Sequence, residues 1–279
     1  MTNLLLILGG TRIGDTFMCL PGLKAYLRLN SITSFDWVCG SWIREIPYLL
    51  KHCDNFPLDS IIIKREMRYP PNDWNDINNF DYRMAYEMFP EYRYVLRLNN
   101  DGYANSGKAH QFYWWANALG IKPDQLQPDD FILKLKHNPL AISGSPYIVV
   151  QPSTITWGKD IEAIRTVGYP LPVYGVGMLN EYKHENWIDY RGHSLTDVAY
   201  LIDNPNCKLF VGINSAITIL ASMLGKPTIM CHFSMINKTG DVFARESGVS
   251  TMFPGNVDLI TPGESELQTV INYMLRKNG

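Results

Sequence analysis

The sequence has few of the cysteine and histidine patterns that mark disulfide-rich or metal-binding proteins. Its cysteines are odd in number and include no C-x-x-C pair and no spacing typical of metal ligands; they are Cys19, Cys39, Cys53, Cys207 and Cys231. We therefore expect reduced, buried thiols. His184, His193 and His232 also lie in none of the usual ligand spacings, and we expect neither a bound metal nor another cofactor.

Long apolar runs and an excess of either charge are also missing. No apolar run is long enough to span a bilayer, and no basic stretch precedes a cleavable apolar segment at the N-terminus. The formal charge of −2 and the pI of about 6.3 give no general electrostatic reason for binding nucleic acid or anionic membranes. We expect a soluble, cytoplasmic protein without stable membrane insertion.

What the sequence does contain is a repeated alternation of short apolar runs and amphipathic segments, which is typical of α/β sheets. With 279 residues and 46% hydrophobic content, the chain is long enough for two moderate domains. The segment 136–146 is rich in proline and small residues, and the alternation begins again after it. We predict two α/β domains, residues 1–140 and 146–279, that face a central cleft.

The pattern predicts the individual elements as well. In the first domain we expect a strand at the leucine run from Leu4, then helix 14–29, strand 35–39, helix 42–50, strand 60–63, strand 94–98 and helix 107–119. In the second we expect strand 147–150, helix 160–166, strand 171–175, strand 187–190, helix 194–202, strand 207–211, helix 215–224, strand 228–231 and helix 264–277. Ser194 and Asp197 resemble a capping box at the start of their helix.

The first candidate for chemistry is the glycine-containing segment between Gly9 and Thr16. It nearly matches the phosphate-binding pattern G-x-x-x-x-G-K-[ST], but Asp15 stands where that pattern has lysine. A carboxylate would repel phosphate, so Asp15 suits an uncharged hydroxyl from which a general base takes a proton. Capping of the following helix explains Asp15 equally well.

Two segments of the second domain suit a diphosphate. The loop after strand 147–150 brings Ser153, Thr154 and Lys159 toward the sheet edge, where Lys159 can neutralise phosphate or can be an ordinary surface lysine. Asn214, Ser215 and Ala216 precede a helix whose backbone amides suit an anion, although Asn and Ser are also common caps.

One carboxylate of the second domain is a candidate for contact with a nucleoside. Glu181 follows strand 171–175 closely enough to meet a ribose or a base. A solvated carboxylate explains this position equally well.

Taken together, these segments resemble the heptosyltransferase family of glycosyltransferases. The resemblance rests on Gly14-Asp15 with Pro21, the loop 151–159, Arg191-Gly192-His193-Ser194-Leu195, and the stretch from Gly212 to Thr228. It implies the GT-B architecture, with two Rossmann-like α/β/α domains and the sugar nucleotide bound mainly by the second. It also implies that the last helix, 264–277, packs back on the first domain, and that transfer inverts the anomeric carbon without a metal; no D-x-D motif is present.

Matched by position, Asp15 corresponds to the family's proposed base and Lys159 to its phosphate-binding lysine. Asn214-Ser215-Ala216 corresponds to the diphosphate loop usually written Asp-[ST]-Gly. The chain departs from that pattern at Asn214, at Ala216 and at Ile219, where the family has histidine. These departures leave the donor open, so ADP-heptose is not assumed.

We therefore predict an inverting glycosyltransferase that moves a sugar from a nucleotide-diphosphate sugar to an acceptor hydroxyl. Asp15 is the expected base, and the donor contacts are Ser153, Thr154, Lys159, Glu181, Asn214, Ser215 and Ala216. Thr11, Arg12 and Gly14 are the expected acceptor contacts. The acceptor is a glycan, a lipid-linked sugar or a modified nucleobase, so nucleic acid enters only as an acceptor. The alternative is a non-catalytic sugar-nucleotide-binding or assembly protein of the same fold.

Overall fold

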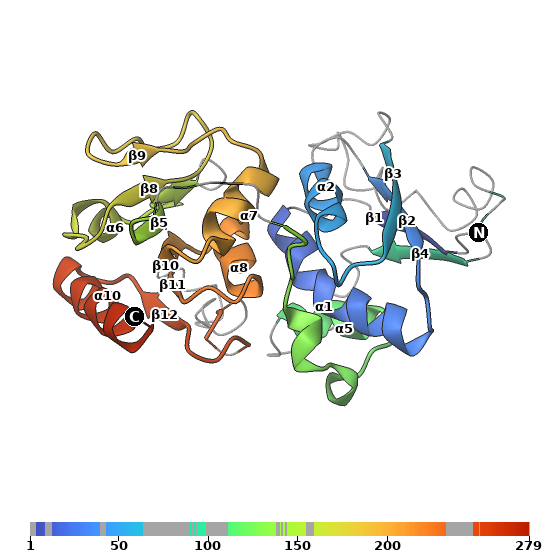
Figure 1. Cartoon of the computed structure of the whole chain (residues 1–279). Helices are drawn as coiled ribbons and strands as arrows, with labels where there is room; N and C mark the ends of the chain where they lie inside the picture. Colours follow the sequence, from blue (N-terminus) through green and yellow to red (C-terminus); the bar gives the residue numbers. More distant parts are fainter. Residues whose placement is uncertain are drawn as a thin grey trace. The chain divides into compact units, whose positions relative to one another are not determined.

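The chain divides into two compact units, residues 1–136 and 137–279. A computed structural model describes residues 4–8, 13–39, 43–63, 90, 92, 94–98, 111–137, 140, 142, 144–154, 159–232, 248–250 and 252–278. Figure 1 shows that each unit has its own sheet with helices packed against it.

The first unit is built on four parallel strands in the order β3-β2-β1-β4. They are β1 (Leu4–Leu8), β2 (Phe35–Cys39), β3 (Leu58–Ile63) and β4 (Tyr94–Leu98). The helices are α1 (Ile13–Leu29), α2 (Glu45–Lys51) and α5 (Gln111–Ala118), and two 3-10 turns follow, η3 (Pro123–Gln125) and η4 (Pro128–Phe131). The central position of β1 agrees with its unbroken apolar run, which is typical of parallel strands covered on both faces.

Helices α1 and α5 approach each other closely at Gly22. A Cβ atom on Gly22 would lie only 2.7 Å from the Cα of Ala116, so the small residues at both positions are required by the packing. Trp37 and Trp115 are also buried in this unit, with 0% and 5% exposure. Core packing therefore accounts for these two tryptophans, and neither offers a face to a sugar.

Two basic side chains of α1 hold the η4 segment in place. The Nζ of Lys24 donates to the carbonyl oxygens of Asp129 and Ile132, and Arg28 forms an ion pair of 2.9 Å with Asp130. Burial lowers the pKa of Lys24. Lys24 and Arg28 therefore stabilise the position of η4, and neither needs to be assigned a role in phosphate binding.

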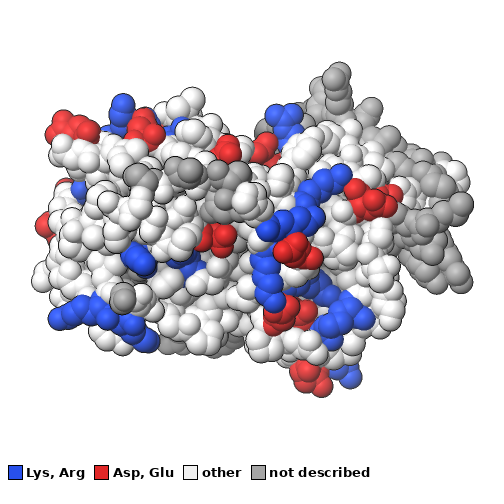
Figure 2. Space-filling model, viewed as in Figure 1, with Lys and Arg blue, Asp and Glu red and all other residues white. Residues whose placement is uncertain are grey.

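Charges of both signs lie side by side on the face shown in Figure 2. One ion pair of the first unit joins Lys134 to Asp129 at 2.7 Å. This mixed pattern agrees with the small net charge of −2.

The second unit contains six parallel strands in the order β12-β11-β10-β5-β8-β9. The strands are β5 (Tyr147–Gln151), β8 (Val173–Gly175), β9 (Ile188–Asp189), β10 (Cys207–Ile213), β11 (Thr228–His232) and β12 (Val257–Ile260). A small antiparallel hairpin joins β6 (Ser153–Thr154) to β7 (Lys159–Asp160). The helices are α6 (Glu162–Thr166), α7 (Leu195–Asp203), α8 (Ala216–Met223) and α10 (Glu264–Asn278).

Helices cover both faces of this sheet, as Figure 1 shows. Leu209, Val211 and Ile213 of β10 point into a core that they share with α6 and α10. On the opposite face lies α8, because a Cβ on Gly212 would come within 2.7 Å of the Thr218 hydroxyl. At the start of α7, Ser194 accepts a hydrogen bond from the backbone of Asp197 and donates one to its carboxylate.

Helix α10 packs on the sheet of its own unit. Its apolar residues Leu267, Ile271 and Met274 belong to the core of the second unit, where α10 packs against α6 and β10. Helix α10 follows β12 directly, and its apolar stripe covers the adjoining face of the same sheet. That this helix also packs back on the first domain stays a prediction.

All five cysteines are free and buried, as the sequence predicts. Burial raises the pKa of Cys39 to about 12 and that of Cys207 to about 11. These thiols are poor nucleophiles at neutral pH, because only the thiolate reacts.

Among the helices in the described part of the chain, none combines the length and the apolar character needed to cross a membrane.

Candidate functional site

Parallel strands all end at one edge of a sheet, and open α/β sheets bind their ligands at this carboxyl edge. In the second unit, polar residues lie at the ends of β5, β10 and β11, or directly after them. They are Gln151, Ser153, Asn214, Ser215 and His232. Neighbouring strands therefore bring together residues from distant parts of the sequence.

Ser215 joins two of these strand ends. Its hydroxyl donates to Oε1 of the buried Gln151 at 2.5 Å and accepts a hydrogen bond from the backbone N–H of Thr218 at 3.4 Å. Ser215 is thus the N-cap of α8, and Ala216 is the first residue of that helix. The backbone amides at this helix start carry partial positive charge, which suits an anion.

A chain of three polar side chains runs from the carboxyl ends of β10 and β11 to Asp258 near the start of β12. Asn214 Nδ2 lies 3.3 Å from His232 Nδ1, and His232 Nε2 lies 2.8 Å from Asp258 Oδ1. His232 is only 2% exposed. Sequence reasoning missed this arrangement, because it considered His232 only as a metal ligand and predicted no strand around Asp258.

Several donors surround the carboxylate of Asp258. Besides His232, the backbone N–H groups of Val249 and Ser250 and the Ser250 hydroxyl donate to it. Burial alone would raise the pKa of Asp258, but the hydrogen bonds from His232 and Ser250 outweigh burial and hold this pKa below its ordinary value. Asp258 is therefore ionised at neutral pH.

The β6–β7 hairpin carries the predicted hydroxyl and lysine contacts. Ser153 is buried, and its hydroxyl accepts a hydrogen bond from the backbone N–H of Tyr182 at 3.3 Å. Thr154 pairs with Lys159 across the hairpin. The Lys159 side chain lies outside the described part of the structure, so its role as a phosphate contact stays a prediction.

The loop after β8 is held by Arg191. This guanidinium forms two hydrogen bonds with Asp189 and donates to the carbonyl oxygens of Leu179 and Glu181. The ion pair holds the pKa of Asp189 well below its ordinary value. Arg191 thus ties the loop that carries Glu181 to the edge strand β9.

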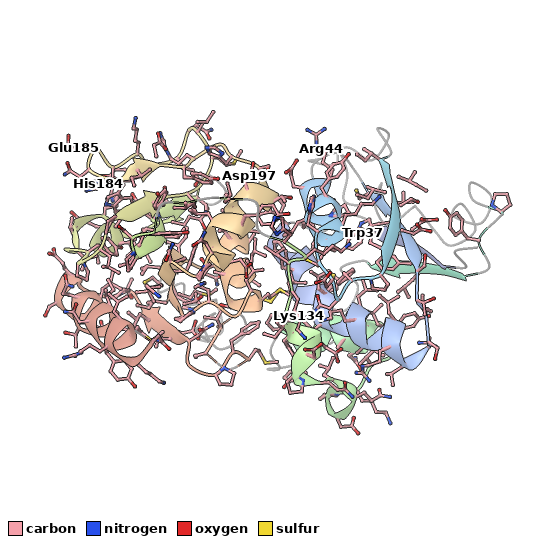
Figure 3. The ribbon with its side chains drawn as sticks, in the orientation of Figure 1. Trp37, Arg44, Lys134, His184, Glu185 and Asp197 are labelled. Atoms are coloured by element: carbon pink, nitrogen blue, oxygen red, sulfur yellow. The ribbon has the colours of Figure 1, made fainter. Side chains whose placement is uncertain are left out.

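Glu181 itself folds over the backbone of its own loop. A Cβ atom on Gly177, whose φ is +142°, would lie 2.1 Å from Glu181 Oε2, and this oxygen is shielded from solvent. The solvated alternative therefore does not describe this oxygen. Figure 3 shows His184 and Glu185 farther along the same connection, where the rings of His184 and Trp187 stack at 4.6 Å.

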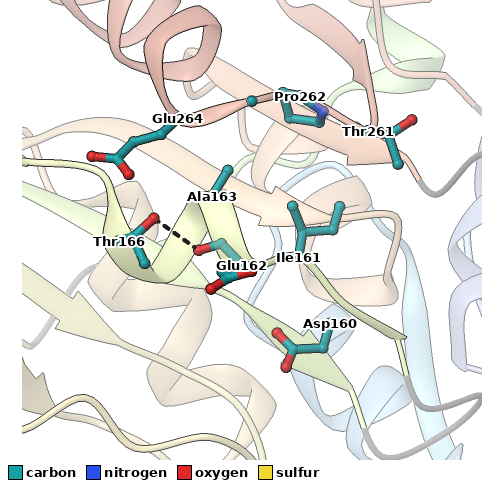
Figure 4. A pocket seen from close by; sticks show the side chains of 9 residues that line it. Asp160, Ile161, Glu162, Ala163, Thr166, Thr261, Pro262 and Glu264 are labelled. Carbon is teal, nitrogen blue, oxygen red and sulfur yellow. Dashed lines mark hydrogen bonds between the residues drawn. The ribbon is translucent and has the colours of Figure 1, made fainter.

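A separate pocket of about 420 Å³ lies beside the N-termini of α6 and α10 (Figure 4). Three carboxylates, Asp160, Glu162 and Glu264, line it. Because like charges repel, this pocket is unsuited to the diphosphate of a nucleotide.

The predicted residues of the first unit are only partly described. Thr11 and Arg12 lie outside the described residues. Gly14 and Asp15 lie in the first turn of α1, two residues or fewer from its start at Ile13. A carboxylate in a first turn interacts favourably with the helix dipole, but this position follows the N-cap.

Solved structures of glycosyltransferases share this fold over most or nearly all of the chain. A glycosyl transferase family 9 protein from Veillonella parvula aligns with a TM-score of 0.68 at 11% identity and covers 99% of each chain. Escherichia coli heptosyltransferase WaaC, solved with ADP, aligns with a TM-score of 0.62 at 15% identity, over 99% of this chain and 100% of WaaC. The iron-containing glycosyltransferase TibC from enterotoxigenic E. coli aligns over 82% of this chain and 58% of TibC, with a TM-score of 0.54 at 12% identity.

No protein-family model and no curated protein matches the sequence. At 11% to 15% identity the likeness concerns the backbone, so the predicted resemblance is confirmed at the level of fold. The chain has the GT-B fold of heptosyltransferase-type glycosyltransferases.

Proposed function

We propose that the protein is an inverting glycosyltransferase that transfers a sugar from a nucleotide-diphosphate sugar to an acceptor hydroxyl. The observation that carries this proposal is the likeness to two glycosyltransferases over 99% of this chain. The residues at the carboxyl edge of the second sheet support it, because they combine small hydroxyls and a helix start. Fold alone does not decide function, so the proposal depends on these residues.

In the proposed reaction, Asp15 takes the proton of the acceptor hydroxyl while the hydroxyl oxygen attacks the anomeric carbon. The new bond forms on the face opposite the leaving group, and the bond between the anomeric carbon and the diphosphate oxygen breaks. The electron pair of that bond leaves with the nucleoside diphosphate, and configuration at the carbon is inverted. General bases of this kind typically contribute about 10² to 10⁴-fold to the rate.

The leaving diphosphate gains negative charge in this step. Lys159 and the backbone amides at the start of α8 are the groups proposed to stabilise this charge. Such preorganised electrostatic stabilisation is often the largest contribution to catalysis. Ser153, Thr154 and Ser215 complete the proposed phosphate contacts, and Glu181 is proposed for the ribose or the base. We propose that no metal takes part.

The donor base and sugar stay open because the diphosphate loop departs from the family pattern. Ile219, where the pattern has histidine, is 3% exposed and packs in the core, so it makes no phosphate contact. The acceptor is proposed to bind the first unit at Thr11, Arg12 and Gly14. Reduced thiols agree with a cytoplasmic reaction.

A thermal-shift screen tests the proposal. The screen contains ADP, UDP, GDP and CMP, each with its sugars. We expect one of these ligands to raise the melting temperature, because a ligand of the folded state stabilises it. The stabilising nucleotide sugar is then incubated with EDTA and candidate acceptors, and release of nucleoside diphosphate is measured. Binding without any turnover would favour the alternative, a non-catalytic sugar-nucleotide-binding or assembly protein. Absence of binding by every nucleotide would overturn both functions, and activity lost in EDTA would contradict metal independence.

A further inference from the structure

The pair of the buried His232 and the partly buried Asp258 has no role in the reaction proposed above, although His232 contacts Asn214 of the diphosphate loop directly. Asn214 follows β10, His232 ends β11 and Asp258 lies in β12, so three strands contribute one residue each. The backbone of Asn214 is also bound to β11, because its N–H donates to the carbonyl oxygen of Cys231 at 3.0 Å. Both the main chain and the side chain of Asn214 therefore depend on β11.

The ionised carboxylate of Asp258 determines which atom donates in each hydrogen bond between Asp258, His232 and Asn214. An ionised carboxylate only accepts hydrogen bonds, so the contact of 2.8 Å requires the proton of His232 to be on Nε2. A neutral imidazole then has a lone pair on Nδ1, which accepts a hydrogen bond. Asn214 supplies it from Nδ2 at 3.3 Å. The amide oxygen of Asn214 consequently points away from the imidazole.

We infer that His232 is a positioning residue, which turns the amide oxygen of Asn214 toward the carboxyl edge to accept a hydrogen bond from a hydroxyl of the donor. This inference rests on the proposed function. The backbone amides at the start of α8 suit the phosphate oxygens, whereas an amide oxygen repels phosphate and accepts from a hydroxyl. The hydroxyl belongs to the ribose or to the transferred sugar, both of which adjoin the diphosphate.

The inference also explains why asparagine can stand where the family pattern has an acidic residue. Both oxygens of a carboxylate accept hydrogen bonds, so a carboxylate needs no orientation. The side chain of asparagine has only one accepting oxygen, and the contact of its nitrogen with His232 determines where that oxygen points. Asparagine also avoids a second carboxylate beside the imidazole that Asp258 already contacts.

A spectroscopic experiment tests the orientation without any ligand. In imidazole ¹⁵N spectra of the full chain, assigned by the signal lost in His232→Gln, we expect His232 to carry its proton on Nε2. The control is Ser250→Ala, which removes a hydrogen bond to Asp258 at Oδ2, the oxygen that does not face His232, and should leave the tautomer unchanged. A proton on Nδ1 in the wild-type protein would overturn the inference.

Binding measurements test the consequence for the donor. Calorimetry is performed with ADP, ADP-glucose, UDP and UDP-glucose. His232→Gln keeps an N–H toward Asp258 but removes the nitrogen that faces Asn214, and we expect affinity to fall about 5- to 10-fold, the value of one hydrogen bond. A loss seen already with the nucleoside diphosphate assigns the ribose, and a loss seen only with its sugar assigns the transferred sugar.

Rescue separates positioning from a general structural effect. In the His232→Gln background, Asn214→Asp should restore affinity to within about twofold, because a carboxylate presents an acceptor in either orientation. Asn214→Leu should lower affinity as much as His232→Gln does, and the double variant should lose no more, since the two changes remove one interaction. Failure of the rescue, or additive losses, would overturn the inference. If neither these four probes nor any other nucleotide of the thermal-shift screen binds the wild-type chain, the proposed function falls with the donor contact, whereas the spectrum still decides the orientation.

Discussion

At the scale of single residues, Asp15 is the proposed base and can be tested by a change of one atom. We expect Asp15→Asn to lower kcat by about 10² to 10⁴-fold, because asparagine cannot take a proton. Donor affinity and melting temperature should change little, since the nucleotide is proposed to bind the second unit. Transfer rates and calorimetric binding are measured on the same preparation.

The matched control for this variant is Glu45→Gln. Glu45 is also a carboxylate in the first turn of a helix of the same unit, α2. A loss of activity in Asp15→Asn but not in Glu45→Gln supports the base. Transfer by Asp15→Asn at close to the wild-type rate would instead reduce Asp15 to a residue that stabilises the start of α1.

Lys159 is the cation proposed for the diphosphate. We expect Lys159→Ala to weaken binding of the nucleoside diphosphate, and the loss to shrink at high salt if the lysine is exposed. Calorimetry at low and high salt measures this. Lys183→Ala is the control, because Lys183 is an exposed lysine of the same unit that pairs with Asp189. Equal effects of both changes would assign Lys159 to the solvated surface.

Asp258 should make folding sensitive to acid. Its pKa in the folded protein is below the ordinary value of about 3.9 for an unfolded aspartate. The unfolded state therefore binds protons first, so the stabilisation by Asp258 is present above about pH 4 and is lost as the pH falls through the lower folded pKa. In urea unfolding from pH 7 to pH 3, the gap in stability between wild type and Asp258→Asn should narrow with acid. A gap that stays constant would contradict this linkage.

At the scale of elements, α10 is the helix whose contribution to the core of the second unit can be tested. Ile271 is fully buried in the core of the second unit, so Ile271→Ala should lower the free energy of unfolding by about 2–5 kcal/mol. Tyr273→Ala on the same helix is the control, because Tyr273 is 52% exposed. Denaturant unfolding of both variants gives the comparison. Similar small losses in the two variants would mean that α10 contributes little to this core.

Much of the element order could be predicted from the sequence. Apolar runs with their flanking turns predicted β5, β10 and β11, and the helical spacing predicted α7, α8 and α10 within a few residues. The prediction missed β12, whose short Val-Asp-Leu-Ile run contains the aspartate that binds His232. It also missed the β6–β7 hairpin, because Ser-Thr and Lys-Asp carry too little apolar character to give an alternating pattern.

The candidate site was harder to predict than the elements. Local patterns identified Ser215 because a cap precedes its own helix in the sequence. Asn214, His232 and Asp258 are separated by 18 and 26 positions and meet only because β10, β11 and β12 are neighbours in the sheet. Such a contact depends on strand order, which no motif spacing records. The amphipathic pattern of α10 likewise shows which face is buried but not against which sheet it packs.

At the scale of the whole molecule, the two compact units predict two thermal transitions, because multidomain proteins commonly depart from two-state unfolding. A saturating nucleoside diphosphate should raise the temperature of one of these transitions. At a free concentration about one hundred times its Kd, a ligand stabilises the folded state by about 2.7 kcal/mol. Scanning calorimetry is performed with and without nucleotide. Ile271→Ala identifies the transition of the second unit, and we expect the nucleotide to raise that same transition. A nucleotide effect confined to the other transition would place the donor on the first unit.

Because all five thiols are buried, their reaction with an alkylating reagent can report local opening of the chain. Cys19, Cys39 and Cys53 lie in the first unit, and Cys207 and Cys231 lie in the second. An alkylating reagent can modify a thiol only when the segment around it opens, so the rate of modification at each cysteine measures how often that segment leaves the native state. Peptide mapping after a brief exposure to reagent then assigns each opening event to one unit without any introduced label. A nucleotide that protects Cys207 and Cys231 while leaving the other three unchanged would show, in the native protein, which half of the chain holds the donor.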